Sequence, residues 1–355
     1  MKTRTIILLL LGCTFFGVGL VSVLFLMSED KMQRNNAFQR RYPHHPSEKI
    51  KELDIQFNSY YIAGFYNDSI YLGNHMAPSH LLVTDLELTD TIHIRLDITE
   101  SEQYPFSNVN AKISDSNIYL MDGTVPIIYM GKIKERIVSP FIKESAYFSR
   151  ISIIDSTGFI VKSMSNKTSK YELGKIKTDG EGSVKLHEDL LEAQIDGVFD
   201  TDGMILNNYQ NKQLIYVYYY RNEYFITDYD LNLFGKRKTI DTISQAQLEV
   251  ISYSTKNTRT LKGNQVIVNS KSATYRNYLF INSPRLGKYE SEDNLKHASI
   301  IDVYNLTDGN YLLSFYLYHH NRENLKEFKV YKNKIYALIE NEIIVYELKD
   351  TYFDL

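Results

Sequence analysis

Two histidines are the first candidates for chemistry in this chain. His75 and His80 lie in a short segment, Gly73–His80, that also contains Pro78 and has the composition of a turn. Neutral imidazole is a common metal ligand, and a carboxylate such as that of Asp122 could complete a set of ligands. No established zinc-ligand spacing accompanies the pair, so two ordinary loop histidines are the competing interpretation.

A second candidate metal site combines carboxylates with glycine. Asp200 and Asp202 alternate within the run Asp196–Gly203, and such alternation resembles part of a calcium-binding loop, in which successive side chains point at one ion. The glutamate that closes such a loop is missing at the required distance, and Asp-Gly pairs are also strong turn signals. We therefore expect a structural turn, with calcium as the alternative, and no other cofactor.

The densest aromatic cluster could bind an organic ligand. Tyrosines recur between Tyr216 and Tyr224, and strand alternation places Tyr216, Tyr218 and Tyr220 on one face. That face could stack on a sugar or a peptide, or it could pack between two sheets. Our candidate ligand-binding residues are His75, His80, Tyr218, Tyr220 and Arg221. No hydrolase elbow, phosphate loop, zinc helix or dinucleotide fingerprint occurs, so no catalytic residue is assigned.

The elements that must position these residues are strands. A phrase of one small or polar residue followed by apolar and aromatic residues recurs roughly every forty to sixty residues. Its six copies are Ser69–Leu72, Asn117–Leu120, Gly158–Val161, Gln213–Val217, Asn277–Ile281 and Lys334–Leu338. A short polar turn and a second apolar strand follow each copy, as in an antiparallel meander. A strand-rich unit repeated in this way predicts an all-β fold, the β-propeller.

We expect six blades within residues 49–350. A lone meander leaves both sheet edges open, so the units must pack side by side in a ring. Apolar residues between Gln247 and Lys262 leave room for a seventh blade. The last unit stops after three strands, and the strand expected at Ile50–Phe57 would complete it and join the two ends of the chain.

Three of the phrases carry a resemblance to known propellers. They read Asp-Ser-Ile-Tyr-Leu from Asp68, Leu-Ile-Tyr-Val from Leu214 and Asn-Lys-Ile-Tyr-Ala-Leu from Asn333. An acidic residue often ends the next strand, at Asp85, Glu172, Asp228, Asp302 and Glu347. From about Ile50 to Leu348 the chain thus resembles six-bladed propellers of the TolB-like and NHL-like kind, in a membrane-anchored bacterial group. The resemblance implies a scaffold that binds proteins, peptides or glycans, with enzymes in the minority.

The N-terminal segment predicts attachment to a membrane. Lys2 and Arg4 precede an uncharged, mainly apolar run, Ile6–Met27, which at about 1.5 Å per residue can cross a hydrocarbon core of roughly 30 Å. No clean cleavage site ends the run, so we expect an uncleaved signal anchor. Residues 1–5 would lie in the cytoplasm, residues 6–27 in a bacterial inner membrane, residues 28–48 would form a polar stalk, and the bulk would face the periplasm.

The single cysteine offers an alternative anchor. Leu10-Leu11-Gly12-Cys13 resembles a bacterial lipobox, with Cys13 as the lipidated residue, although an apolar stretch rather than a polar tether follows it. One cysteine excludes a disulfide within the chain. A net charge of −3 without a long basic run argues against nucleic-acid partners, and the lack of tryptophan argues against WD-repeat and quinone-cofactor propellers.

Two functions follow from these patterns. The first is a membrane-tethered, extracytoplasmic propeller that binds or scaffolds a protein, peptide or glycan partner. The alternative is a propeller hydrolase or lyase with a metal in the central funnel, held by His75, His80 and acidic neighbours. In either case we expect the functional residues in the segments that break the repeat, namely Gly73–His80, Thr178–Gly203 and Pro284–His297.

Overall fold

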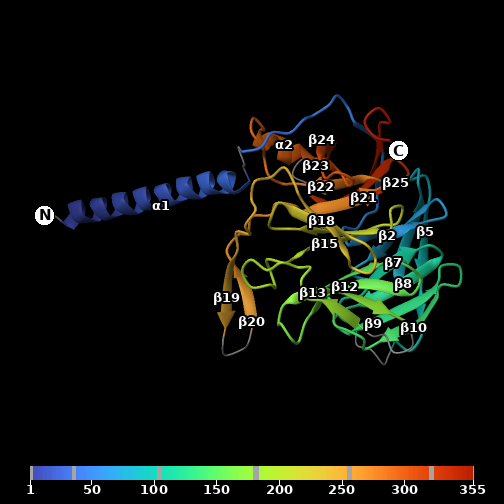
Figure 1. The fold of residues 1–355 in the computed structure, drawn as a ribbon. Helices are drawn as coiled ribbons and strands as arrows, with labels where there is room; N and C mark the ends of the chain where they lie inside the picture. Colours follow the sequence, from blue (N-terminus) through green and yellow to red (C-terminus); the bar gives the residue numbers. More distant parts are fainter. Residues whose placement is uncertain are drawn as a thin grey trace.

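The protein is a six-bladed β-propeller preceded by one long helix, α1 (Thr3–Gln33) (Figure 1). The computed structural model describes residues 3–33, 37–101, 106–178, 184–253, 258–319 and 324–354. Each blade contains four antiparallel strands, and blade 2 gains a short parallel fifth strand. The prediction of six blades is confirmed.

The blades follow one another along the chain. Blade 1 is β2 (Tyr60–Tyr66), β3 (Ser69–Asn74), β4 (His80–Asp85) and β5 (Thr91–Arg95). Blade 2 is β7 (Asn110–Ser114), β8 (Asn117–Asp122), β9 (Ile127–Lys132) and β10 (Ile137–Lys143), with β6 (Asp97–Ile98) beside β10. Blade 3 is β11 (Arg150–Ile153), β12 (Gly158–Met164), β13 (Tyr171–Lys177) and β14 (Val184–His187).

The second half of the ring repeats this order. Blade 4 is β15 (Gly203–Asn208), β16 (Gln213–Tyr218), β17 (Glu223–Thr227) and β18 (Leu233–Lys238). Blade 5 is β21 (Lys271–Tyr275), β22 (Tyr278–Asn282), β23 (Ala298–Asn305) and β24 (Tyr311–Tyr318). Blade 6 is β25 (Leu325–Tyr331), β26 (Lys334–Ile339) and β27 (Glu342–Leu348), completed by β1 (Ser47–Asp54).

The ring closes by pairing the two ends of the propeller. β1 runs antiparallel to β27, from Ser47 opposite Leu348 to Asp54 opposite Glu342. A strand from the N-terminal side therefore supplies the outer edge of the last blade, as the sequence predicts, although it begins and ends three residues earlier than expected. The closure makes the stability of blade 6 depend on residues before blade 1.

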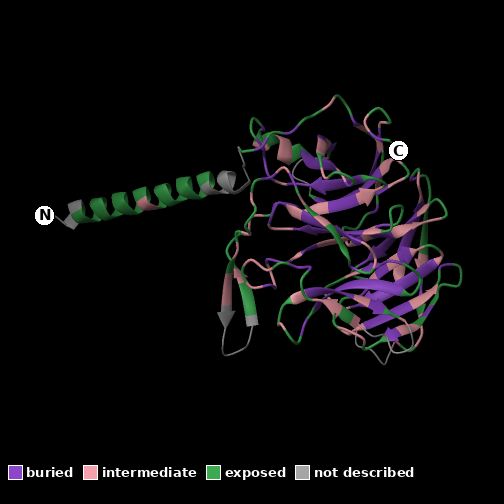
Figure 2. Ribbon diagram, in the orientation of Figure 1, coloured by how far each residue is buried: buried purple, intermediate pink, exposed green. Residues whose placement is uncertain are grey.

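The recurring phrases form the second strand of each blade, where both sheet faces pack against neighbouring blades. All six positions of β8 are buried, and the buried strands stand out in Figure 2. Between blades 4 and 5, Ile215 and Val217 pack with Leu279 and Ile281. Each such side chain contributes about 1.5–3 kcal/mol by leaving water. Burial on both faces explains why apolar and aromatic residues follow the first, small or polar, residue of each phrase.

Two insertions depart from the repeat. β19 (Glu249–Tyr253) and β20 (Thr258–Lys262) form a two-stranded hairpin that projects beside the ring (Figure 1), so the region considered for a seventh blade is a hairpin instead. Blade 5 carries a short helix, α2 (Glu292–His297), whose N-terminus is capped by the side chain of Ser291. Neither insertion adds a blade.

The segment before β1 lies against blade 5. Arg40 is 5% exposed, and its guanidinium contacts the carboxylates of Asp302 and Glu290, each at 2.6 Å. The backbone N–H of Lys288 donates to the carbonyl of Phe38 at 2.8 Å. Charge pairs and backbone bonds together hold the chain on the propeller before it reaches the closing strand.

Within the described residues, one helix has the length and composition to cross a membrane. It is Ile6–Met27, with a mean hydropathy of 2.6 and no part of it buried in the protein. The helix projects away from the propeller (Figure 1), and nearly all of Ile6–Met27 is exposed (Figure 2). The apolar N-terminal helix is thus confirmed.

Candidate binding site in the central channel

The first strand of each blade faces the centre of the ring. These inner strands are β2, β7, β11, β15, β21 and β25, and most neighbouring pairs contact one another around the channel. They carry more polar residues than the second strands because they border a cavity rather than another blade. The sequence Asn-Ala-Lys-Ile-Ser of β7 illustrates the difference.

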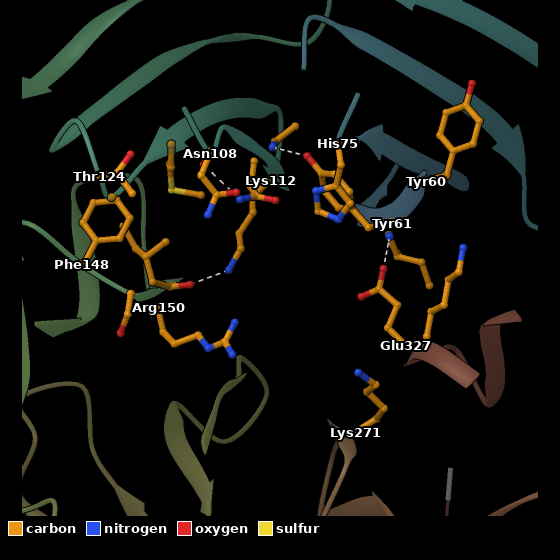
Figure 3. Close-up of a pocket in the computed structure, with 18 of the residues that line it drawn as sticks. Tyr60, Tyr61, His75, Asn108, Lys112, Thr124, Phe148, Arg150, Lys271 and Glu327 are labelled. Carbon is orange, nitrogen blue, oxygen red and sulfur yellow. Dashed lines mark hydrogen bonds between the residues drawn. The ribbon is translucent and has the colours of Figure 1, made fainter. Parts of the chain in front are cut away.

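A cavity of about 1130 Å³ opens at one end of the channel. It is lined by residues of blades 1, 2, 3, 5 and 6, and Figure 3 shows their side chains converging on a common space. We call this cavity the cationic chamber because its lining includes five cationic side chains, those of Lys112, Arg150, Lys271, Lys326 and Lys329. One carboxylate, that of Glu327, accompanies them.

The charge of the five cations is compensated only in part, because Glu327 is the one carboxylate in the described lining of the chamber. Among the described residues, none of them forms an ion pair with a carboxylate. Lys112 donates from Nζ to the carbonyl of Ile151 at 2.5 Å, a bond to a neutral group. The Glu327 carboxylate accepts the backbone N–H of Ile62 instead (Figure 3). Five cations beside one carboxylate leave the described lining with a net positive charge that can act on a ligand.

The cations occupy two levels of the channel. Lys112 lies opposite Tyr119 in β8, and Lys329 lies opposite Tyr336 in β26, so both occupy the same register in their blades. A second cavity, of about 580 Å³, shares Ile62, Lys112 and Lys329 with the chamber. These three side chains thus lie between the two cavities, whereas Arg150 and Lys271 line only the cationic chamber.

Crowding of like charge shows in the lysine pKa values. Burial, with Lys329 and Arg150 nearby, lowers the pKa of Lys112 to about 8. Burial and the charge of Arg150 also lower the pKa of Lys271. Both groups resist protonation because burial removes their charge from water, and the Glu327 carboxylate compensates for this only in part. A bound anion would supply that compensation.

Aromatic and amide side chains surround the cations. Tyr147 is 67% exposed at the edge of the chamber, beside Phe148. Tyr61 is held in place because its hydroxyl accepts the backbone N–H of Ala111 at 2.5 Å. Three amides also line the cavity, those of Asn58, Asn108 and Asn110. The chamber thus combines charge, exposed ring faces and neutral hydrogen-bonding groups.

The structure separates the two histidines predicted as ligands. His75 lines the cationic chamber, with its ring 4.4 Å from that of Tyr61, and burial lowers its pKa. His80 begins β4, and its Nε2 lies 2.9 Å from Nδ1 of His93 in β5. The Asp122 carboxylate instead accepts backbone N–H groups, including that of Asn108. No common metal site results from these residues.

The remaining candidate residues lie in blade 4 and the loop before it. Tyr218 and Arg221 come together, with the guanidinium 3.6 Å from the ring centroid, but both are buried and Arg221 donates to the carbonyl of Glu192. Tyr220 is partly exposed beside Tyr219, away from both cavities. Tyr218 and Arg221 are therefore part of the packing of blade 4, whereas Tyr220 stays partly exposed outside both cavities.

The two carboxylates considered for calcium have other partners. Asp200 accepts backbone N–H groups of the loop before it, including that of Gly197 at 2.7 Å. Asp202 forms an ion pair with Lys162 at 2.8 Å. In the part of the chain that the structure describes, no group of three or more His, Cys, Asp or Glu side chains is arranged to hold a metal ion.

Sequence reasoning missed the cations of the chamber. A partial signal existed, because Lys112 and Lys329 each precede the tyrosine of a recurring phrase by seven residues and lie opposite it, at Tyr119 and Tyr336. Attention to the strand before each of these phrases would have located both lysines on inner strands. Lys271 lies at a different register and has no such signal.

Comparison with known proteins supports the fold. Neither a protein-family model nor a curated protein matches the chain. A solved member of the DUF4221 family from Bacteroides vulgatus is similar over 86% of this chain and 99% of its own, with 12% identity and a TM-score of 0.50. At this identity the similarity shows the propeller architecture alone.

Two further solved structures are less similar. The computationally designed Ika8 protein matches over 83% of this chain and 98% of its own, with 9% identity and a TM-score of 0.40. The nidogen/laminin complex contains a chain that matches over 73% of this one and 81% of its own, with 11% identity and a TM-score of 0.41.

Proposed function

We propose that the protein is a membrane-tethered binding module whose ligand enters the cationic chamber of the propeller. The observation that carries this proposal is the chamber itself, a cavity of about 1130 Å³ with unpaired charge. Ligand sites are typically concave, with a few convergent polar groups. The ligand belongs to a protein, peptide or glycan partner outside the cytoplasm.

The tether supports the extracytoplasmic placement. Helix α1 contains the apolar run Ile6–Met27, and Lys2 and Arg4 precede it, so the positive-inside tendency leaves the propeller on the outer side of an inner membrane. Alkaline carbonate should fail to extract the full chain from membranes, and protease added to spheroplasts should digest the propeller. Extraction of the protein, or protection of its propeller, would contradict the proposed topology.

Hydrogen exchange tests the binding role. The full chain in an uncharged detergent is compared with and without the soluble extracytoplasmic fraction of its own cells. Binding in the chamber should slow amide exchange in Tyr147–Ile151 and β21 and leave the outer strand β5 unchanged. Unchanged exchange at the chamber, or slowing confined to the outer strands, would refute the chamber as the binding site.

A further inference from the structure

We propose that the cationic chamber binds an acidic oligosaccharide. Arg150, Lys271 and the two lysines between the cavities, Lys112 and Lys329, hold the carboxylates of the ligand. The sugar rings of the ligand stack on Tyr147 and the aromatic side chains beside it. This inference rests on the proposed function and names the ligand class of the same site. The ligand is recognised by the chemistry of the chamber lining.

The positive charge of the chamber lining favours an anionic ligand. Five cations face one cavity in a chain whose net charge is −3, and Glu327 supplies the one carboxylate of the lining that the structure describes. Charged groups gathered in a concave, low-dielectric wall focus their field on the space between them. That field selects an anion and repels a cationic ligand.

The number and origin of the cations favour a ligand with several anionic groups. They come from β7, β11, β21 and β25, which belong to four different blades around the channel. The chamber also exceeds the range of about 300–1,000 Å³ that is usual for small-molecule sites. An extended polyanion can reach cations on several blades at once, whereas a single small anion cannot fill this space.

Aromatic and amide groups favour sugar rings between the anionic groups. The exposed ring of Tyr147 lies beside Phe148, and Tyr171 lines the same cavity. Aromatic faces pack against the apolar faces of sugars, and amides such as those of Asn108 and Asn110 can donate to and accept from hydroxyl groups. A uronic-acid oligosaccharide requires cations for its carboxylates, aromatic faces for its sugar rings and amides for its hydroxyl groups, and this cavity contains all three.

Calorimetry on the full chain in an uncharged detergent tests the proposal. The probes are oligomers of galacturonate, of mannuronate and guluronate, and a heparin hexasaccharide, with neutral maltohexaose and hexaglutamate for comparison. At least one acidic oligosaccharide should bind, and its affinity should fall steeply as salt increases. Maltohexaose should not bind.

Paired variants locate the site. Arg150→Gln with Lys271→Gln should weaken binding at least tenfold. Lys134→Gln with Lys238→Gln removes the same charge from exposed positions outside the chamber and should leave affinity within twofold. Tyr147→Ala should weaken oligosaccharide binding several-fold without altering the thermal transition. An unchanged transition would show that the loss of affinity comes from the missing ring contact with the sugar and not from a less stable protein.

Each contrary outcome has a distinct meaning. If hexaglutamate binds and the acidic oligosaccharides do not, the site is one for acidic peptides and the proposal is overturned. If the control pair weakens binding as much as the chamber pair, the interaction is a general charge effect and the proposal is equally overturned. If no probe binds but the cell fraction still slows exchange at Tyr147–Ile151, the oligosaccharide proposal fails while the proposed function stands.

Discussion

At the scale of single residues, the buried charge of Lys112 lowers the free energy of unfolding of the protein. The ordinary pKa of Lys112, 10.5, falls to about 8 in the folded protein, chiefly through burial and then through Lys329 and Arg150. Between these two pH values the unfolded chain binds more protons at this site than the folded chain. The contribution of Lys112 to the free energy of unfolding therefore rises with pH across this window and is most unfavourable below pH 8.

Lys112→Met should remove that dependence. Below pH 8 the variant should exceed the wild type in free energy of unfolding by about 2–3 kcal/mol, and the difference should shrink as pH rises toward 10.5. Urea denaturation at pH 7 and pH 10 measures both values, with the exposed Lys134→Met exchange as control. A difference between the variant and the wild type that does not change with pH would refute this role.

Arg40 is the second residue whose loss should be costly. Arg40→Ala leaves the buried carboxylates of Asp302 and Glu290 without their cation, and uncompensated buried charge typically costs about 3–5 kcal/mol. Arg41→Ala, at the exposed neighbouring position, should cost less than about 1 kcal/mol. Chemical denaturation that found equal effects for the two variants would show that the buried charges are not coupled as the structure indicates.

Residue types alone located part of the candidate site. His75 was predicted from its turn and does line the chamber. The pair Tyr218 and Arg221 is chemically suited to a ligand but is turned into the packing of blade 4. Which of these residues face a cavity depends on how the blades pack around the axis, and the spacing of residues along one strand contains no information about that packing.

At the scale of elements, the strands that sequence predicts best are those buried on both faces. Apolar and aromatic residues fill β8 from Ile118 to Met121 and β26 from Ile335 to Ile339, so these strands can be recognised without knowledge of how the blades are arranged. The inner strands mix lysine, serine and asparagine because one side borders a cavity, as in β7 and β21. Such strands resemble exposed loops or edges in sequence, which is why the lining of the cationic chamber was not predicted.

The closing strand gives a prediction at this scale. A chain that begins at residue 37 keeps Arg40 and β1 and should remain folded and monodisperse. A chain that begins at residue 55 loses β1 and exposes the edge of β27, an open edge that favours association. Size-exclusion chromatography and thermal melting should show a lower transition and aggregation only for the shorter chain; equal behaviour of both would mean that closure adds little.

At the scale of the whole molecule, charge is distributed unevenly. The chain carries a net charge of −3, yet the chamber concentrates five cations around one carboxylate. The segments expected to hold the function contribute little to this cavity, because His75 is their one residue in its described lining. The proposed binding site lies instead on the repeat itself, on inner strands that the ring brings together, while α1 provides the proposed tether.

The most direct test of the proposed binding site is a crystal structure of the protein with the acidic oligosaccharide that binds most tightly. We expect uronate carboxylates within hydrogen-bond distance of Arg150 and Lys271, with a sugar ring against Tyr147. An oligosaccharide bound at the β19–β20 hairpin or on the outer strands, with the cationic chamber free of it, would show that the chamber is not the binding site.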